Sequence, residues 1–116
     1  MIRRVRIQDA ADIVAIYNRY IAETTVTFEI EPISVCEMQK RISDIASSFP
    51  YFVYEDEGRV AGYAYVHRWK ERAAYAHTLE TTVYLNPDIR HSGIGTALMQ
   101  HIINECRTQG YKVLIA

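Results

Sequence analysis

Two glycines, Gly93 and Gly95, stand one residue apart, after the basic pair Arg90 and His91 and just before a helical pattern. Residues 75–85, upstream of them, are rich in β-branched and aromatic residues and predict a strand. A strand, a glycine turn and a helix together favour phosphate binding, because the free N–H groups and the dipole at a helix start attract an anion. Glycine also lets the backbone come close to such a ligand. This stretch therefore predicts a phosphate-binding turn.

Two known phosphate motifs do not fit this turn. A P-loop has a lysine and then Ser or Thr after its second glycine, whereas Thr96 and Ala97 follow Gly95. A dinucleotide fingerprint has Gly or Ala three residues after the second glycine, where this chain has Leu98, and it belongs in the first βα unit. What remains is the pattern R-x-x-G-x-G over residues 90–95, for which a plain glycine turn is the alternative.

One carboxylate, Glu80, interrupts the otherwise uncharged strand TLETTVYL at residues 78–85. A carboxylate within a strand must be solvated or paired. Antiparallel strands often have one wet face, so a solvent-facing or salt-bridged Glu80 is the plainer interpretation. The chemical interpretation is a general base, because a carboxylate can remove a proton from an ammonium group directly or through a water.

Periodicity and turn residues predict the elements that position these groups. In chain order they are a strand at 2–7, a helix at 9–23, a helix that follows Ser34, strands at 51–57, 59–69 and 75–85, a helix at 93–109 and a strand at 112–116. Asp9 is expected to cap the first helix, Ser34 and Glu37 to form a capping box for the second, and Gly110 to end the last. The predicted order is β-α-α-β-β-β-α-β.

Composition limits the classes of function. The chain has 116 residues, which predicts a single domain, and its formal net charge of -1 argues against a nucleic-acid or membrane-surface partner. It has no run of about 18 apolar residues that could span a membrane. The first residues, MIRRVRIQDAADI, carry charges where a signal peptide has an apolar run, so we expect a cytoplasmic location.

The cysteines and histidines do not indicate a metal site. Cys36 and Cys106 are far apart and occupy helical core positions, so we expect two buried thiols rather than a disulfide or a nucleophile. His67, His77 and His101 lack metal-ligand spacing with one another or with the cysteines.

The glycine motif resembles the acetyl-CoA pyrophosphate loop of the GNAT superfamily of N-acetyltransferases. More closely, the chain resembles the phosphinothricin acetyltransferase group in three separate segments: IYNRYIAETTVTFEIEP at 16–32, WKERAAY at 69–75 and TLETTVYL at 78–85. The resemblance implies an α+β, sandwich-like GNAT fold with a mixed, mostly antiparallel sheet flanked by helices.

The resemblance also implies an activity. Acetyl would pass directly from acetyl-CoA, the co-substrate, to the amine of a small amino-acid-like acceptor of the phosphinothricin or methionine sulfoximine type, with no metal. Glu80 matches the glutamate that is proposed as general base in this group. The backbone of Val83, Tyr84 and Leu85 would pair with the pantetheine arm. The residues around the pyrophosphate would be Arg90, His91, Ser92, Gly93, Ile94, Gly95 and Thr96.

Four further residues are candidates for the acceptor site. Phe28 and Glu29 match a loop that walls the substrate pocket in this group, with local packing and a solvated charge as the alternatives. Arg72 and Tyr75 could bind a substrate carboxylate, since a guanidinium suits that planar group, and surface placement is the alternative.

The family's domain usually continues beyond KVLIA at 112–116 with another helix and at least two strands. We therefore expect residues 1–116 to be a single acetyltransferase domain that lacks the usual C-terminal elements. A homodimer could complete the open sheet edge. Two functions stay open: an N-acetyltransferase, or a catalytically inactive truncated module that binds CoA or serves assembly.

Overall fold

The structure is a computed structural model that describes residues 1–23, 31–68, 78–88, 93–110 and 112–115. The elements, in chain order, are β1 (Ile2–Arg4), a 3-10 helix η1 (Ile7–Asp9), α1 (Ala10–Glu23), α2 (Val35–Ala46), β2 (Tyr51–Asp56), β3 (Arg59–Arg68), β4 (Thr78–Leu85), α3 (Ile94–Thr108) and β5 (Lys112–Ile115). The predicted order of strands and α-helices is confirmed.

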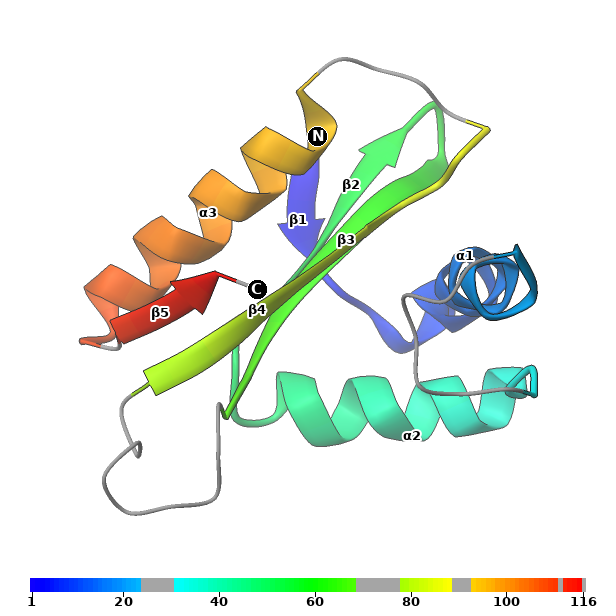
Figure 1. Cartoon of the computed structure of the whole chain (residues 1–116), viewed down its shortest axis with the longest axis horizontal. Helices are drawn as coiled ribbons and strands as arrows, with labels where there is room; N and C mark the ends of the chain where they lie inside the picture. Colours follow the sequence, from blue (N-terminus) through cyan, green and yellow to red (C-terminus); the bar gives the residue numbers. More distant parts are fainter. Residues whose placement is uncertain (24–30, 69–77, 89–92, 111, 116) are drawn as a thin grey trace.

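The strands form one five-stranded sheet in the order β1-β2-β3-β4-β5. Neighbours from β1 to β4 are antiparallel, and β5 is parallel to β4. Figure 1 shows α1 and α2 on one side of this sheet and α3 on the other. The mixed, mostly antiparallel sheet flanked by helices is therefore confirmed.

Alternation along the strands divides the core into two clusters. The cluster under α1 and α2 has buried residues from both helices and from the near face of β2 and β3, among them Ile13, Ile42, Val53 and Tyr63. The cluster under α3 joins the opposite face of the same strands to residues such as Leu98 of that helix. Each buried side chain of β3 therefore belongs to one of two distinct environments.

Local sequence signals account for the helix ends of α2 and α3. The Ser34 hydroxyl accepts the backbone N–H of Glu37 at 3.0 Å, so Ser34 caps α2 as predicted. Gly110 follows α3 and donates its N–H to the carbonyl of Arg107 at 3.1 Å. Both ends lie within two residues of their predicted positions.

Cys36 is exposed, and its predicted burial is wrong. The buried stripe of α2 contains Met38 and Ile42. Cys36 precedes Met38 by two residues, which rotates it by about 200° around the helix, so that it faces away from the sheet. Cys106 is fully buried as predicted, and burial raises the pKa of its thiol.

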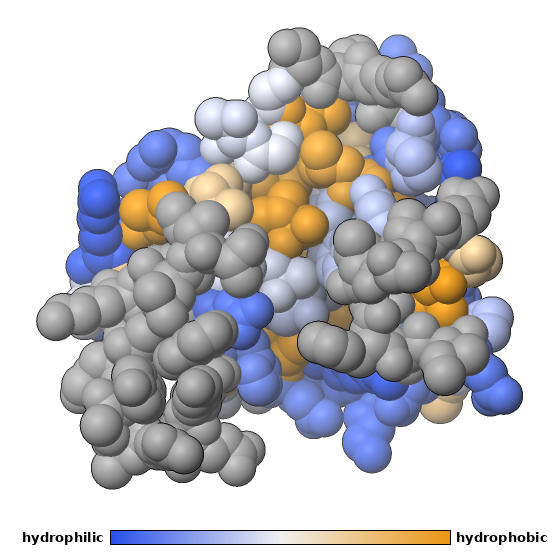
Figure 2. Space-filling model, in the orientation of Figure 1, coloured by the Kyte–Doolittle hydropathy of each residue, from blue (hydrophilic) through white to orange (hydrophobic). Residues whose placement is uncertain are grey.

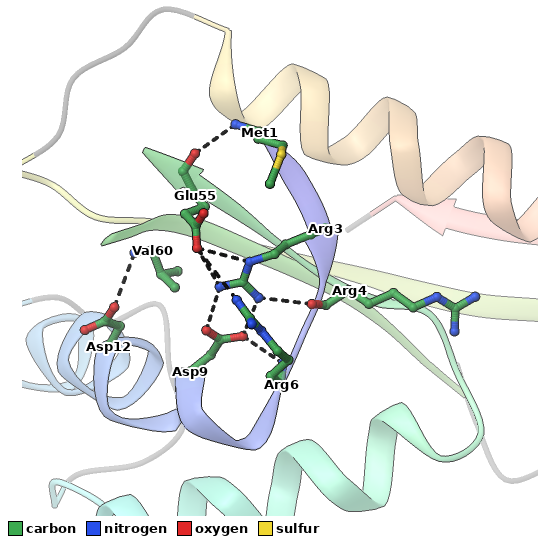
Figure 3. A network of polar contacts seen from close by, with 8 residues as sticks. All are labelled: Met1, Arg3, Arg4, Arg6, Asp9, Asp12, Glu55 and Val60. Atoms are coloured by element: carbon green, nitrogen blue, oxygen red, sulfur yellow. Dashed lines mark hydrogen bonds and ion pairs between the residues drawn. The ribbon is translucent and has the colours of Figure 1, made fainter. Parts of the chain in front are cut away.

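Asp9 does not cap α1, and that prediction is also wrong. Its carboxylate accepts the backbone N–H of Arg6 at 2.7 Å from the end of η1. It also receives two hydrogen bonds from Arg3, at 2.8 and 2.9 Å (Figure 3). The buried carboxylate therefore ties the start of the helical layer to β1. The first strand ends at Arg4, short of the predicted residue 7.

Candidate active site

The C-terminal half of β4 has one open edge among the described residues. β4 pairs with β3 from Arg68 opposite Leu79 to Gly62 opposite Leu85. Its pairing with β5 covers Thr78 to Thr81. Beyond Thr81 the strand keeps β3 on one side and has no described strand on the other, so backbone N–H and C=O groups there can pair with an extended ligand.

The glycine turn leads directly from this edge into α3. Gly93 is the N-cap of the helix with a left-handed φ of 89°, a conformation that favours glycine. Its carbonyl accepts the N–H of Ala97 at 2.8 Å. The N–H groups of Ile94, Gly95 and Thr96 precede the first intrahelical bond and lack an acceptor within the helix. These donors and the helix dipole make the start of α3 suitable for a phosphate.

The predicted residues of this turn divide into two sets. Ile94, Gly95 and Thr96 form the first turn of α3 instead of the loop before it. Ile94 is buried under the sheet and Thr96 is exposed. Arg90, His91 and Ser92 lie outside the described residues.

Gly62 on β3 supports the same region, and sequence reasoning missed it. A Cβ atom at this position would lie 2.7 Å from a methyl carbon of Leu85 and 3.1 Å from the carbonyl oxygen of Tyr84. A side chain here would have to displace the Leu85 side chain and would crowd the Tyr84 carbonyl, so glycine suits this close approach of β3 and β4. An isolated glycine inside a strand pattern is the signal that could have indicated this close approach.

Three consecutive residues of α1 hold the segments around the site, and sequence reasoning missed these contacts too. The side-chain amide of Asn18 donates to the carbonyl of Ile33 at 3.0 Å and accepts the Ile33 N–H at 2.9 Å. Arg19 pairs with Asp88 at 2.6 Å and holds the pKa of that exposed carboxyl below its usual value. The Tyr20 hydroxyl donates to the carbonyl of Leu85 at 2.8 Å.

These contacts place α1 between two parts of the chain. Asn18 fixes the segment just before α2, which follows residues 24–30. Arg19 and Tyr20 fix the end of β4 and the turn that follows it. α1 therefore supports the end of β4.

Glu80 is half-buried and lies opposite His67 of β3. Cross-strand partners share a face, and Tyr84, four residues on, shares it too. Tyr84 lies opposite Tyr63 and packs its ring against Tyr17 and Tyr20 of α1. Glu80 therefore faces the side of the sheet covered by α1 and α2.

Figure 2 shows the molecule from the side on which β4 runs. Among the coloured residues of that surface, hydrophobic ones gather in the middle and hydrophilic ones lie mostly toward the edges. Glu80 and the open edge both belong to β4, because Glu80 lies in the part paired with β5 and the open edge begins beyond Thr81. The four acceptor-site candidates, Phe28, Glu29, Arg72 and Tyr75, lie outside the described residues.

In the described ranges, no group of three His, Cys, Asp or Glu side chains could hold a metal ion. The helices of the same ranges include none that is long and apolar enough to cross a membrane.

Comparison with known proteins agrees with this arrangement. The acetyltransferase (GNAT) family matches residues 13–116. A phosphinothricin N-acetyltransferase of Streptomyces viridochromogenes is 36% identical over 99% of this chain and 63% of its own length. An L-methionine sulfoximine/L-methionine sulfone acetyltransferase of Pseudomonas aeruginosa is 32% identical over 99% of this chain and 68% of its own.

A solved structure shows the same fold. A phosphinothricin acetyltransferase of Sinorhizobium meliloti, solved in complex with AcCoA, superposes with a TM-score of 0.92 at 34% identity, over 99% of this chain and 64% of that one. The chain belongs to the GNAT acetyltransferase family. It spans 63% and 59% of the length of two phosphinothricin N-acetyltransferases that it matches.

Proposed function

We propose that the protein transfers an acetyl group from acetyl-CoA to the amine of a small amino-acid-like acceptor. The observation that carries this proposal is the open edge of β4 beside the glycine-capped start of α3. An extended strand edge suits the pantetheine arm, and a helix start suits the pyrophosphate at its end. The open edge of β4 comes just before the start of α3 in the chain. One extended acetyl-CoA molecule can therefore lie along both, with its pantetheine arm at the strand and its pyrophosphate at the helix.

The cofactor roles follow from this placement. The backbone of Val83, Tyr84 and Leu85 pairs with the pantetheine arm. Gly93 brings the backbone close to the pyrophosphate, and the first-turn N–H groups of α3 donate to it. The exposed Thr96 has a hydroxyl that can donate a further hydrogen bond there.

The chemical step requires a neutral amine, because an alkyl ammonium ion has no lone pair to attack a thioester. Glu80 is the general base that removes this proton, directly or through one water. The amine nitrogen then forms a bond to the acetyl carbon, the carbon–sulfur bond breaks, and CoA leaves as the thiol or thiolate. A backbone N–H on the cofactor strand stabilises the oxyanion of the intermediate.

The acceptor class follows from the relatives. Those whose names specify an acceptor include acetyltransferases of phosphinothricin and of L-methionine sulfoximine or L-methionine sulfone. All three compounds are amino acids with a free α-amine and a side chain of similar length. We therefore propose an α-amino acid acceptor of this size.

The experiment compares CoA release by the wild-type chain and by Glu80→Gln, with an α-amino acid acceptor present. Loss of a general base costs about 10²- to 10⁴-fold in rate, so Glu80→Gln should lower kcat by at least the lower figure. The control Glu57→Gln changes an exposed carboxylate in the β2–β3 turn and should leave kcat unchanged.

Calorimetric titration with acetyl-CoA separates binding from chemistry. Glu80→Gln should bind acetyl-CoA like the wild type, whereas Gly93→Val should lose binding because its φ is left-handed. Equal rates of CoA release for wild type and Glu80→Gln would rule out Glu80 as the base. Saturable binding without any CoA release would favour a CoA-binding module over an enzyme.

A further inference from the structure

A pocket of about 270 Å³ lies between the two N-terminal helices and the sheet, on the Glu80 face. Its walls come from α1, α2, β2 and β3. The lining residues are Tyr17, Met38, Arg41, Asp44, Ile45, Tyr51, Tyr63, Tyr65 and His67, and we call this the tyrosine pocket. Sites for drug-sized ligands occupy roughly 300–1,000 Å³, so the volume suits a smaller molecule or one side chain.

Aromatic rings dominate the tyrosine pocket. Tyr51 and Tyr65 stack with ring centroids 4.9 Å apart, and Tyr63 continues the stack at 6.4 Å from Tyr65. Tyr51 and Tyr63 are 5% and 2% exposed, and burial raises the pKa of both phenols well above its usual value. These two phenols therefore stay uncharged at physiological pH.

The tyrosine pocket adjoins the proposed base. His67 lines the pocket and is the cross-strand partner of Glu80, and Tyr65 is the partner of Thr82. Side chains of directly opposed residues have Cβ atoms about 4.5–5.5 Å apart. An amino acid whose amine lies at Glu80 can therefore extend its side chain past His67 into the pocket.

The charges of the tyrosine pocket are balanced. Arg41 lies 3.5 Å from Glu37 in an ion pair, and Asp44 places an exposed carboxylate on the same wall. The faces of aromatic rings carry negative charge density, which disfavours an anion. A negatively charged side chain would lose its hydration here without gaining an unopposed cation.

We propose that the tyrosine pocket receives the side chain of the acceptor amino acid and selects an uncharged, polarisable group, such as a sulfone or sulfoximine, over an anionic phosphinate. This inference rests on the proposed function. It makes Tyr65, Met38 and Asp44 residues that determine the preferred acceptor.

Methyl NMR can test this without turnover. The chain has three methionines, Met1, Met38 and Met99, of which Met38 lines the tyrosine pocket. With ¹³C-methyl methionine incorporated, L-methionine sulfone should shift the Met38 signal saturably. L-Phosphinothricin should shift it with a Kd roughly tenfold higher. Both probes carry the same α-amino acid group, so the ratio of their two Kd values measures the preference of the pocket for one side chain over the other.

Charge reversal at the pocket sharpens the test. Asp44 is exposed, so Asp44→Lys should fold normally while making the wall cationic. We expect it to improve phosphinothricin binding and reduce the ratio of the two Kd values to about one, a change within the range of a nearby charge. Glu57→Lys makes the same charge change in the β2–β3 turn, away from the pocket, and should leave the ratio unchanged.

Equal Kd values in the wild type, shifts confined to Met1 or Met99, or an equal effect of the two lysine variants would overturn the assignment. Parallel assays of CoA release distinguish it from the proposed function. Saturable Met38 shifts without CoA release from acetyl-CoA would contradict the proposed acetyl transfer but not the pocket assignment. CoA release without a Met38 shift would contradict the pocket assignment but not acetyl transfer.

Discussion

At the scale of single residues, β4 places two polar side chains in opposite environments. Glu80 faces α1 and α2, where it is half-buried. Thr81, the next residue, points to the α3 side and is 1% exposed. Its hydroxyl has no hydrogen-bond partner among the described residues. An unpaired buried hydroxyl costs roughly 1–3 kcal/mol, so this position lowers the stability of the strand that carries the proposed base.

Thr81→Val should raise the free energy of unfolding by about 1 kcal/mol, because a methyl group replaces an unpaired hydroxyl in nearly the same volume. Urea denaturation measures the change. Thr82→Val is the matched control, since Thr82 is half-buried on the opposite face and should respond less. A destabilised Thr81→Val variant would show that the hydroxyl has a hydrogen-bond partner in the folded protein.

At the scale of elements, α1 supports the end of β4. Tyr20 donates to the carbonyl of Leu85, which is the last residue of β4, and Arg19 pairs with Asp88 just beyond it. Gly62 of β3 packs closely against Leu85. The direction in which the chain leaves β4 toward the glycine turn therefore depends on α1 and β3 together.

Tyr20→Phe should weaken acetyl-CoA binding by roughly three- to tenfold, because one hydrogen bond that positions the strand end is lost. Calorimetry gives the Kd, and thermal unfolding measures any loss of stability. Tyr54→Phe is the control, because Tyr54 is half-buried on the α3 side of β2, and β3 separates that strand from β4. Unchanged acetyl-CoA affinity in a folded Tyr20→Phe variant would contradict this positioning role.

At the scale of the whole molecule, an ionic network joins the N-terminus to the sheet and to the helical layer (Figure 3). Arg3 bonds both Asp9 and Glu55, with nitrogen–oxygen distances of 2.8 and 3.0 Å. The N-terminal amine of Met1 donates to the carbonyl of Glu55 at 2.8 Å. Burial opposes ionisation of Asp9, but the hydrogen bonds from Arg3 and Arg6 outweigh it and hold the pKa of Asp9 below its usual value.

This network predicts a loss of stability in acid. Because the pKa of Asp9 is lower in the folded than in the unfolded chain, its contribution is present above the unfolded value of about 4 and is lost as the pH falls through the folded value. Asp9→Asn should lower the free energy of unfolding by about 2 kcal/mol at pH 7 and by less at pH 3. Denaturation at both pH values measures this, and an equal loss at both would contradict it.

Much of the fold could be predicted because its signals are local. Ser34 caps a helix through Glu37, three residues away, and Met38 and Ile42 mark its buried stripe. The β2–β3 hairpin and the end of α3 likewise depend on neighbouring glycines, Gly58 and Gly110. The prediction that Cys36 is buried was wrong. Met38 and Ile42 are more hydrophobic than Cys36 and determine which face of α2 is buried, and Cys36 does not lie on that face.

The sequence alone determined the order of elements, the glycine-capped helix and, by resemblance, the family, since these depend on residues close together in the chain. The tertiary structure decided the ion pair of Asp9 with Arg3, the hydrogen bond from Tyr20 to the Leu85 carbonyl and the tyrosine pocket beside Glu80. Each of these brings together side chains from separate elements. No pattern within one segment encodes such contacts, because they arise only when the sheet and both helical layers pack together.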